Sequence, residues 1–287
     1  MAAVTAEMVK ALRERTGAGM LDCKKALNEA NGDEQAAIEI LRKKGAATAA
    51  KCADRDANMG KVLLAQTASR AVAIEANCET EPVGNLDEFN ALAKECLQLT
   101  MDNNPADLEA LGALKTSSGD TVAVAWEQLT GKIGEKMGIR RFAVIEKAAD
   151  EVVGLYSHMG GKIGVAVKLA VAGAAPEAAA ELAKSIAMQV AAFAPVAIRP
   201  SEIDPALVAK EREIYREQAA QAGTKPEFID RQVEGRLGKY YKEVCLEEQS
   251  TAFDAKKSCK QLIAETAKEI GASSIVVKQF VRFALGK

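Results

Sequence analysis

Cysteine is the first residue type in this sequence whose side chain could carry chemistry. The six cysteines are separated by long gaps and none forms a CxxC pair, so the spacing of a zinc ribbon or a redox dithiol is absent. They are Cys23, Cys52, Cys78, Cys96, Cys245 and Cys259. Because no export signal accompanies them, we expect reduced thiols that fill core positions.

Histidine is the second such type, and His158 is the single one in the chain. One imidazole alone excludes most zinc enzymes and most nucleophiles that a histidine base activates. His158 follows a strand pattern, and a histidine at a strand end is more often structural or interfacial than catalytic. Trp126 falls on an amphipathic helix, where we expect it in the core rather than as a stacking platform.

Phosphate-binding loops are also absent from the sequence. No Gly-Lys pair has the upstream glycine or the following serine or threonine of a P-loop, and no GxGxxG pattern occurs. The acidic residues are scattered over predicted helix faces, which is typical of a solvated surface. We therefore expect no catalytic residues, no metal and no cofactor, and favour recognition of another macromolecule over an enzyme.

The bulk composition bounds the class of protein. With 287 residues the chain is too long for one ordinary domain, so two or three are expected. Its apolar fraction of 48% and charged fraction of 27% are normal for a globular protein. A formal charge of −2 gives no sign of nucleic acid or an anionic membrane as the main partner. No apolar run is long enough to span a bilayer, and the acid-containing start indicates neither a signal nor a transit peptide.

The first 45 residues have the pattern of three short helices. Thr5 can cap the first, which runs to about residue 15, and a glycine-rich break precedes a second helix over residues 20–30. Leu21 is expected to point inward there. Asp33 can cap a third helix, which we expect Gly45 to end. So small a bundle has little core and commonly serves as a docking unit.

Beyond a polar linker near residues 54–60, alternating apolar residues predict strands in two blocks with helices between them. The predicted strands are 62–65, 71–74, 141–146, 152–158, 163–171 and 275–283. The predicted helices are 87–101, 121–133, 177–192 and 260–269. Two similar strand–helix blocks predict two related α+β subdomains.

A long helical pair interrupts the second block. Residues 205–222 and 226–244 each have apolar residues along one side, and Gly223-Thr224-Lys225-Pro226 supplies the turn. This pattern predicts an antiparallel helical hairpin. The expected organisation is an N-terminal module over 1–54, a core N-subdomain over 55–140, and a core C-subdomain over 141–287 with the hairpin inserted at about 203–245.

Three ordered motifs carry a resemblance to a known family. The first is the run LRERTGAGMLDCKKAL at residues 12–27. The second is KIGE at 132–135, leading to IRR at 139–141. The third is YSH at 156–158, followed by KIGV at 162–165 and IAM at 186–188. Together they resemble the elongation factor Ts family, over nearly the whole chain.

The resemblance implies an α+β fold with a three-helix UBA-like module, a two-subdomain core with antiparallel sheets, and the inserted hairpin. It implies binding to elongation factor Tu carrying GDP, and exchange of that GDP for GTP. The partner's GTPase domain would contact Arg13, Met20, Leu21 and Lys24 of the module, and Ile133 and Gly134 near the nucleotide pocket. His158 matches a histidine that contacts the partner's third domain.

The residue types at positions 20 and 21 also favour a contact surface on the module. Met20 and Leu21 follow a glycine break and need not both be buried, and flexible apolar groups beside a positive rim suit a contact patch. For Leu21 the core of the small bundle is the alternative.

At one motif the chain departs from the family. The family's wedge, which disturbs the Mg²⁺ site of the partner, is Thr-Asp-Phe-Val, whereas this chain has Thr80, Glu81, Pro82 and Val83. Proline cannot reproduce the reach of a buried aromatic anchor, which is often worth ~2 kcal/mol or more. A histidine after Ile-Ala-Met is Gln189 here, and a Gln-Pro-Phe segment is Gln249-Ser250-Thr251.

Two functions of different classes follow. One is an exchange factor that speeds GDP release; the other is a binding-only relative that holds elongation factor Tu with weak exchange. A metabolic enzyme on a borrowed scaffold is a distant third. The expected partner is elongation factor Tu; we expect no direct binding to nucleic acid and no binding to a membrane. The complex could contain one or two copies of each protein, and this chain could itself form a homodimer. The expected location is a bacterial cytoplasm.

Overall fold

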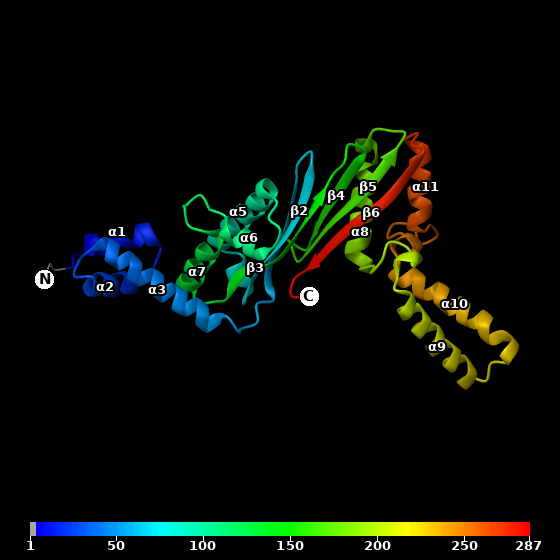
Figure 1. Ribbon diagram of the computed structural model, residues 1–287, viewed down its shortest axis with the longest axis horizontal. Helices are drawn as coiled ribbons and strands as arrows, with labels where there is room; N and C mark the ends of the chain where they lie inside the picture. The colour runs from blue at the N-terminus through cyan, green and yellow to red at the C-terminus, as the bar shows by residue number, and fades with distance from the viewer. Residues whose placement is uncertain (1–3) are drawn as a thin grey trace.

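The computed structural model describes residues 4–287, so the first three residues of the predicted module 1–54 lie outside it. The molecule is elongated, with three helices at the N-terminal end, two sheets in the middle, and a protruding pair of helices beyond the second sheet (Figure 1). Across residues 4–287, every helix is too short or too polar to cross a membrane.

The N-terminal module consists of three helices, as predicted. They are α1 (Ala6–Thr16), α2 (Met20–Glu29) and α3 (Glu34–Cys52). Thr5 caps α1 by accepting a 3.2 Å hydrogen bond from the backbone N–H of Met8, and Asp33 caps α3. The buried core of the module comprises Val9, Leu12, Cys23, Ala26, Leu27 and Ala37.

Two expectations within the module were wrong. Gly45 does not end α3, which continues to Cys52, because this glycine lies where α3 crosses another helix and a side chain is not needed there. Leu21 does not point inward; it is 74% exposed, because the core positions of α2 are filled by Cys23, Ala26 and Leu27.

The first sheet has the antiparallel order β1-β2-β3, with strands β1 (Met59–Gln66), β2 (Arg70–Cys78) and β3 (Met137–Glu146). Four helices connect β2 to β3: α4 (Glu81–Gly84), α5 (Asp87–Asn103), α6 (Leu108–Ala113) and α7 (Val122–Ile133). The short helices α4 and α6 were not predicted. Trp126 of α7 is buried and meets Phe89 of α5 edge-on at 5.5 Å between ring centroids, which confirms its place in the core.

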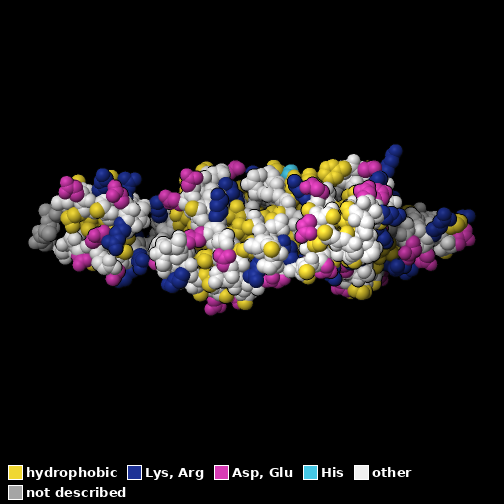
Figure 2. Space-filling model, turned by 90° about the horizontal axis from the view of Figure 1, so that it is seen from above, with side chains coloured by type: hydrophobic (Ala, Val, Ile, Leu, Met, Phe, Trp, Pro, Cys, Tyr) yellow, Lys and Arg dark blue, Asp and Glu magenta, His cyan; other side chains and the backbone are white. Residues whose placement is uncertain are grey.

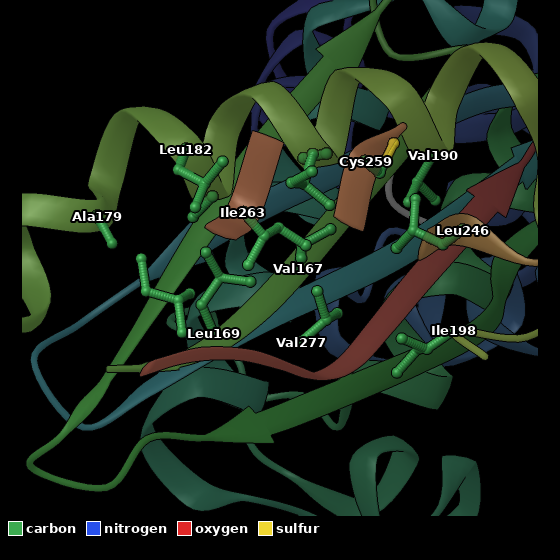
Figure 3. Close-up of a cluster of buried hydrophobic side chains, with 14 of the residues drawn as sticks. Val167, Leu169, Ala179, Leu182, Val190, Ile198, Leu246, Cys259, Ile263 and Val277 are labelled. Carbon is green, nitrogen blue, oxygen red and sulfur yellow. The ribbon is translucent and has the colours of Figure 1, made fainter. Parts of the chain in front are cut away.

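The second sheet repeats this layout with the order β4-β5-β6. Its strands are β4 (Glu151–His158), β5 (Ile163–Ala172) and β6 (Ser274–Ala284). The helices α8 (Ala180–Phe193) and α11 (Cys259–Glu269) cover one face, and aliphatic side chains fill the space between them and the strands (Figure 3). In both sheets a hairpin is followed by helices and then by a third strand that pairs with the second. The predicted α+β fold with antiparallel sheets is confirmed.

The two sheets contact each other through close backbone approaches and through hydrogen bonds from an ion pair of the first sheet to the end of the chain. The backbone N–H of Val62 in β1 donates a 2.8 Å hydrogen bond to the carbonyl of Gly161. A Cβ atom on Gly164 of β5 would lie 2.3 Å from a methyl carbon of Val62, so only glycine fits there. The carboxylate of Glu75 is fully buried and accepts a 2.7 Å hydrogen bond from Arg141 Nε, beside the final residues of the chain.

The hairpin is formed by α9 (Pro205–Gln221) and α10 (Pro226–Val244), as predicted. The helices are joined by charged pairs along their length, among them Arg216 with Asp230 at 2.9 Å. The base of the hairpin packs on the body through the buried side chains of Ala197, Ile203 and Cys245.

All six cysteines lie in the described part of the chain, and all are free and buried, as expected. Burial raises the pKa of Cys78, Cys96 and Cys245 to about 11 and that of Cys259 to about 12.

These thiols are expected to be unreactive in the folded protein. At pH 8 a thiol with a pKa near 11 is ionised in roughly one molecule per thousand, against roughly one in four for an ordinary cysteine. Iodoacetamide should leave the native chain unmodified over minutes, whereas guanidinium-unfolded chain should gain six adducts by mass spectrometry. Rapid native labelling of any of these four cysteines would contradict the burial described.

A candidate macromolecular docking surface

Two of the four residues singled out in the module lie at a shallow hollow where the module meets α7. Arg13, Met20 and neighbouring glycines line one side of this hollow, and Lys132 and Ile133 line the other. Met20 is 58% exposed although it is apolar. Lys24 lies on the same side of α2, one turn beyond Met20, and is exposed. In the space-filling view, apolar side chains on the module are bordered by charged ones (Figure 2).

Gly134 ends α7 and connects the hollow to the wedge segment. It adopts φ +84°, a left-handed conformation that favours glycine, and no atom lies within 4 Å of where a Cβ would be. Its carbonyl accepts a 3.2 Å hydrogen bond from the guanidinium of Arg55. The next residue, Glu135, accepts hydrogen bonds from the backbone N–H of Thr80 at 3.1 Å and from its hydroxyl at 2.9 Å.

A second carboxylate fixes the same junction. Glu79 accepts a 2.6 Å hydrogen bond from the backbone N–H of Lys136 and a 3.2 Å hydrogen bond from Arg55. The Lys136 N–H, followed by the Arg55 side chain, holds the pKa of this carboxyl below its ordinary value. Its contribution to stability is therefore present above the ordinary pKa and is lost as the pH falls through the lowered one.

The wedge segment lies where β2 ends and α4 begins. Thr80, Glu81 and Pro82 are exposed, and Pro82 occupies the first turn of α4, where a missing N–H costs nothing. Val83 is 7% exposed and packs in the core under the first sheet, so its side chain is not part of the accessible surface.

The turn between β4 and β5 adjoins the wedge. Lys162 Nζ lies 3.4 Å from the carboxylate of Glu81, and this ion pair joins the second sheet to the segment after β2 at the surface. His158 begins this turn and is exposed, with its Nδ1 3.0 Å from the hydroxyl of Tyr156. Met159 follows it and is 64% exposed.

Among the predicted site residues, these contacts join the wedge, the end of α7 and the turn after β4, and the hollow of the module adjoins the end of α7. We call the accessible set the docking face: it comprises Arg13, Met20, Leu21, Lys24, Ile133, Gly134, Thr80, Glu81, Pro82 and His158.

The family profile described as Elongation factor TS matches residues 79–287. The chain belongs to the elongation factor Ts family. Relatives named Elongation factor Ts agree over almost its whole length.

Three such relatives illustrate the similarity. Elongation factor Ts of Clostridium perfringens is 42% identical over 286 residues, covering 99% of this chain and 93% of the relative. Those of Chlorobium luteolum and Chlorobium chlorochromatii are 43% and 44% identical over 292 residues, covering all of both chains.

Two departures from the elongation factor Ts pattern meet beside the second sheet, between α8 and the segment after α10. The buried amide of Gln189 donates to the side-chain oxygen of Gln249 at 3.2 Å and to the carbonyl of Ser250 at 3.1 Å. Its own oxygen accepts a 2.8 Å hydrogen bond from the backbone N–H of Ala252. Both glutamines are 2% exposed, so these changes bear on internal packing rather than on the docking face.

Sequence reasoning missed the residues that hold the docking face together. Glu135 and Lys162 stand inside the motifs quoted above, so their proximity to the site had a signal. Arg55 had none, because its partners Glu79 and Gly134 are 24 and 79 residues away in the sequence.

Proposed function

We propose that this chain binds elongation factor Tu in its GDP-bound and nucleotide-free forms and promotes the exchange of GDP for GTP. The observation that carries the proposal is the docking face, in which the pairs Thr80–Glu135 and Glu81–Lys162 join the wedge segment to the end of α7 and to the turn between β4 and β5. Family membership supports the identity of the partner.

Exchange of this kind requires no catalytic side chain. A protein that binds nucleotide-free partner more tightly than nucleotide-bound partner must weaken nucleotide binding by the same factor. The docking face suits this task because it is a long surface that contacts a partner at several separated points. We therefore propose that the chain is an exchange factor and not an enzyme.

The proposed contacts divide along the face. The UBA-like module, residues 1–54, would dock on the GTPase domain through Arg13, Met20, Leu21 and Lys24. Ile133 and Gly134 would approach the nucleotide pocket, where the open space beside Gly134 permits close backbone contact. His158 would contact the partner's third domain.

The wedge would act on the partner's Mg²⁺. That ion bridges nucleotide phosphate to protein, so displacing it weakens the electrostatic hold on GDP. Here the exposed carboxylate of Glu81 and the exposed ring of Pro82 stand where the family has aspartate and phenylalanine. We propose that Thr80, Glu81 and Pro82 enter the partner, while Val83 supports them from the core.

We also propose the division of the core into subdomains and the cellular location. The core divides into an N-subdomain, 55–140, and a C-subdomain, 141–287, each with its own sheet and buried cluster. The bacterial sources of the relatives favour a bacterial cytoplasm.

Stopped-flow release of a fluorescent GDP analogue from elongation factor Tu tests the proposal. Release should accelerate with added factor and reach a plateau. A complex that forms without any acceleration at saturating factor would show a binding-only protein and contradict exchange.

Restoring the family's aromatic ring is expected to speed release. Pro82→Phe should raise the plateau rate about tenfold, equivalent to about 1.4 kcal/mol, because the ring adds an anchor that proline lacks. Pro226→Phe makes the same change in the first turn of an exposed helix away from the docking face and should leave the rate unchanged. A Pro82→Phe rate equal to that of the parent would show that the missing ring does not limit exchange.

A further inference from the structure

One helix, α3, belongs both to the N-terminal module and to the core and forms the main connection between them. Its first half contributes Ala37, Ile38 and Leu41 to the core of the module. Its second half lies on α7, where Cys52 is buried with its Sγ 3.6 Å from the carbonyl of Gly134. A continuous helix of this length is a rod of roughly 28 Å. The angle at which α3 crosses α7 therefore sets where the module lies.

Glycines occupy both sides of this crossing, and they are not equivalent. A Cβ on Gly131 of α7 would lie 2.4 Å from the Cα and 3.2 Å from the carbonyl carbon of Gly45, so α3 would have to move. A Cβ on Gly45 would meet its nearest atom, the carbonyl oxygen of Glu127, at 3.8 Å, which is an ordinary contact. The crossing thus tolerates a side chain on α3 but not on α7.

The same crossing adjoins the hollow of the docking face. Lys132 and Ile133, the two residues after Gly131, line that hollow opposite Arg13 and Met20. A tilt of about 10° displaces a point about 12 Å along a helix by about 2 Å, a distance comparable to the depth of a side-chain contact. A second tether, the 3.1 Å ion pair of Arg42 with Asp120, opposes such a tilt.

We propose that Gly131 is a positioning residue for the docking face. By letting α3 and α7 touch through their backbones, it holds Met20 and Leu21 in line with Ile133 and the wedge. A side chain at this position changes the angle between α3 and α7 and displaces the module, which weakens partner binding. The module itself stays folded, because its own core does not include α7. The effect on the partner rests on the proposed function; the effect on the angle does not.

The angle is measured first, without any partner. Spin labels on introduced cysteines at the exposed positions Lys10→Cys and Lys94→Cys report the distance from module to core by pulsed electron paramagnetic resonance. Gly131→Ala should shift this distance by about 2 Å or more, whereas Gly45→Ala should leave it unchanged. An unchanged distance in Gly131→Ala overturns the proposal. If Gly131→Ala does not fold, the Arg42→Ala variant is measured in its place. The distribution of distances between its two spin labels should be broader than in the parent, and an unchanged width overturns the proposal.

Affinity for nucleotide-free elongation factor Tu is measured next, in a double-mutant cycle. Gly131→Ala alone should weaken binding about tenfold, and Gly45→Ala should not. In a Met20→Ala/Leu21→Ala background, Gly131→Ala should cause a smaller further loss, because the contacts of Met20 and Leu21 are already gone while those of Arg13 and Lys24 remain. Full additivity, or unaltered affinity despite a shifted distance, overturns the positioning role. Absence of binding by the parent protein would instead overturn the proposed function, and the distance shift would still support the geometry.

Discussion

Arg141→Ala is expected to lower the free energy of unfolding by about 2–3 kcal/mol, because it leaves a buried carboxylate without its cation while two neutral donors remain. Glu75 is 0% exposed, and Arg141 Nε donates to it at 2.7 Å. The same guanidinium donates to the carbonyl of Ala284 at 3.3 Å and lies 4.4 Å from the centroid of Phe283. Losing it therefore also loosens the final strand from the first sheet. Urea unfolding followed by circular dichroism measures the change.

Two controls separate the buried charge from other effects. Arg140→Ala removes an exposed neighbouring cation and should change stability by no more than about 0.5 kcal/mol. The double variant Glu75→Gln/Arg141→Ala carries no buried charge and should be more stable than Arg141→Ala alone. A single variant as stable as the parent would contradict the assigned role of the pair.

Met20→Asp is expected to raise the Kd for nucleotide-free elongation factor Tu about thirtyfold, or about 2 kcal/mol, with little effect on stability. Met20 is 58% exposed at the hollow shared with Ile133, so aspartate removes an apolar contact and introduces a charge that binding would desolvate. Titration calorimetry gives the Kd, and thermal unfolding gives the stability.

Leu108→Asp is the matched control for this variant. Leu108 is another exposed apolar side chain, 43% accessible, at the start of α6 and outside the docking face. Its replacement should leave the Kd unchanged. Equal losses in the two variants would indicate a general effect of charge and contradict a specific contact at Met20.

The sequence predicted the long elements well because their signals are local. Both arms of the hairpin begin at a proline and carry an apolar stripe, and the predicted starts at Pro205 and Pro226 are confirmed. The helices α4 and α6 were missed because four and six residues are too few to display a period. Gly45 was wrongly predicted to end α3. A glycine is present at this position because α3 packs closely against α7 there, and the contacting residue, Gly131, is 86 residues away in the sequence.

The candidate site was predictable as separate motifs but not as one surface. The motif around Thr80 and the motif around Ile133 meet through Glu135, and no periodicity encodes a hydrogen bond between residues 55 positions apart. The pair of Glu81 with Lys162 depends in the same way on how the two sheets pack together. Local spacing also could not show that Val83 is buried while its three predecessors are exposed.

The affinities for GDP-bound and nucleotide-free elongation factor Tu, measured side by side by titration calorimetry, test most directly the claim that this chain exchanges nucleotide by differential binding. We expect nucleotide-free partner to bind about a hundredfold more tightly, and GDP to bind the complex more weakly by the same factor. Equal affinities for the two forms would contradict it.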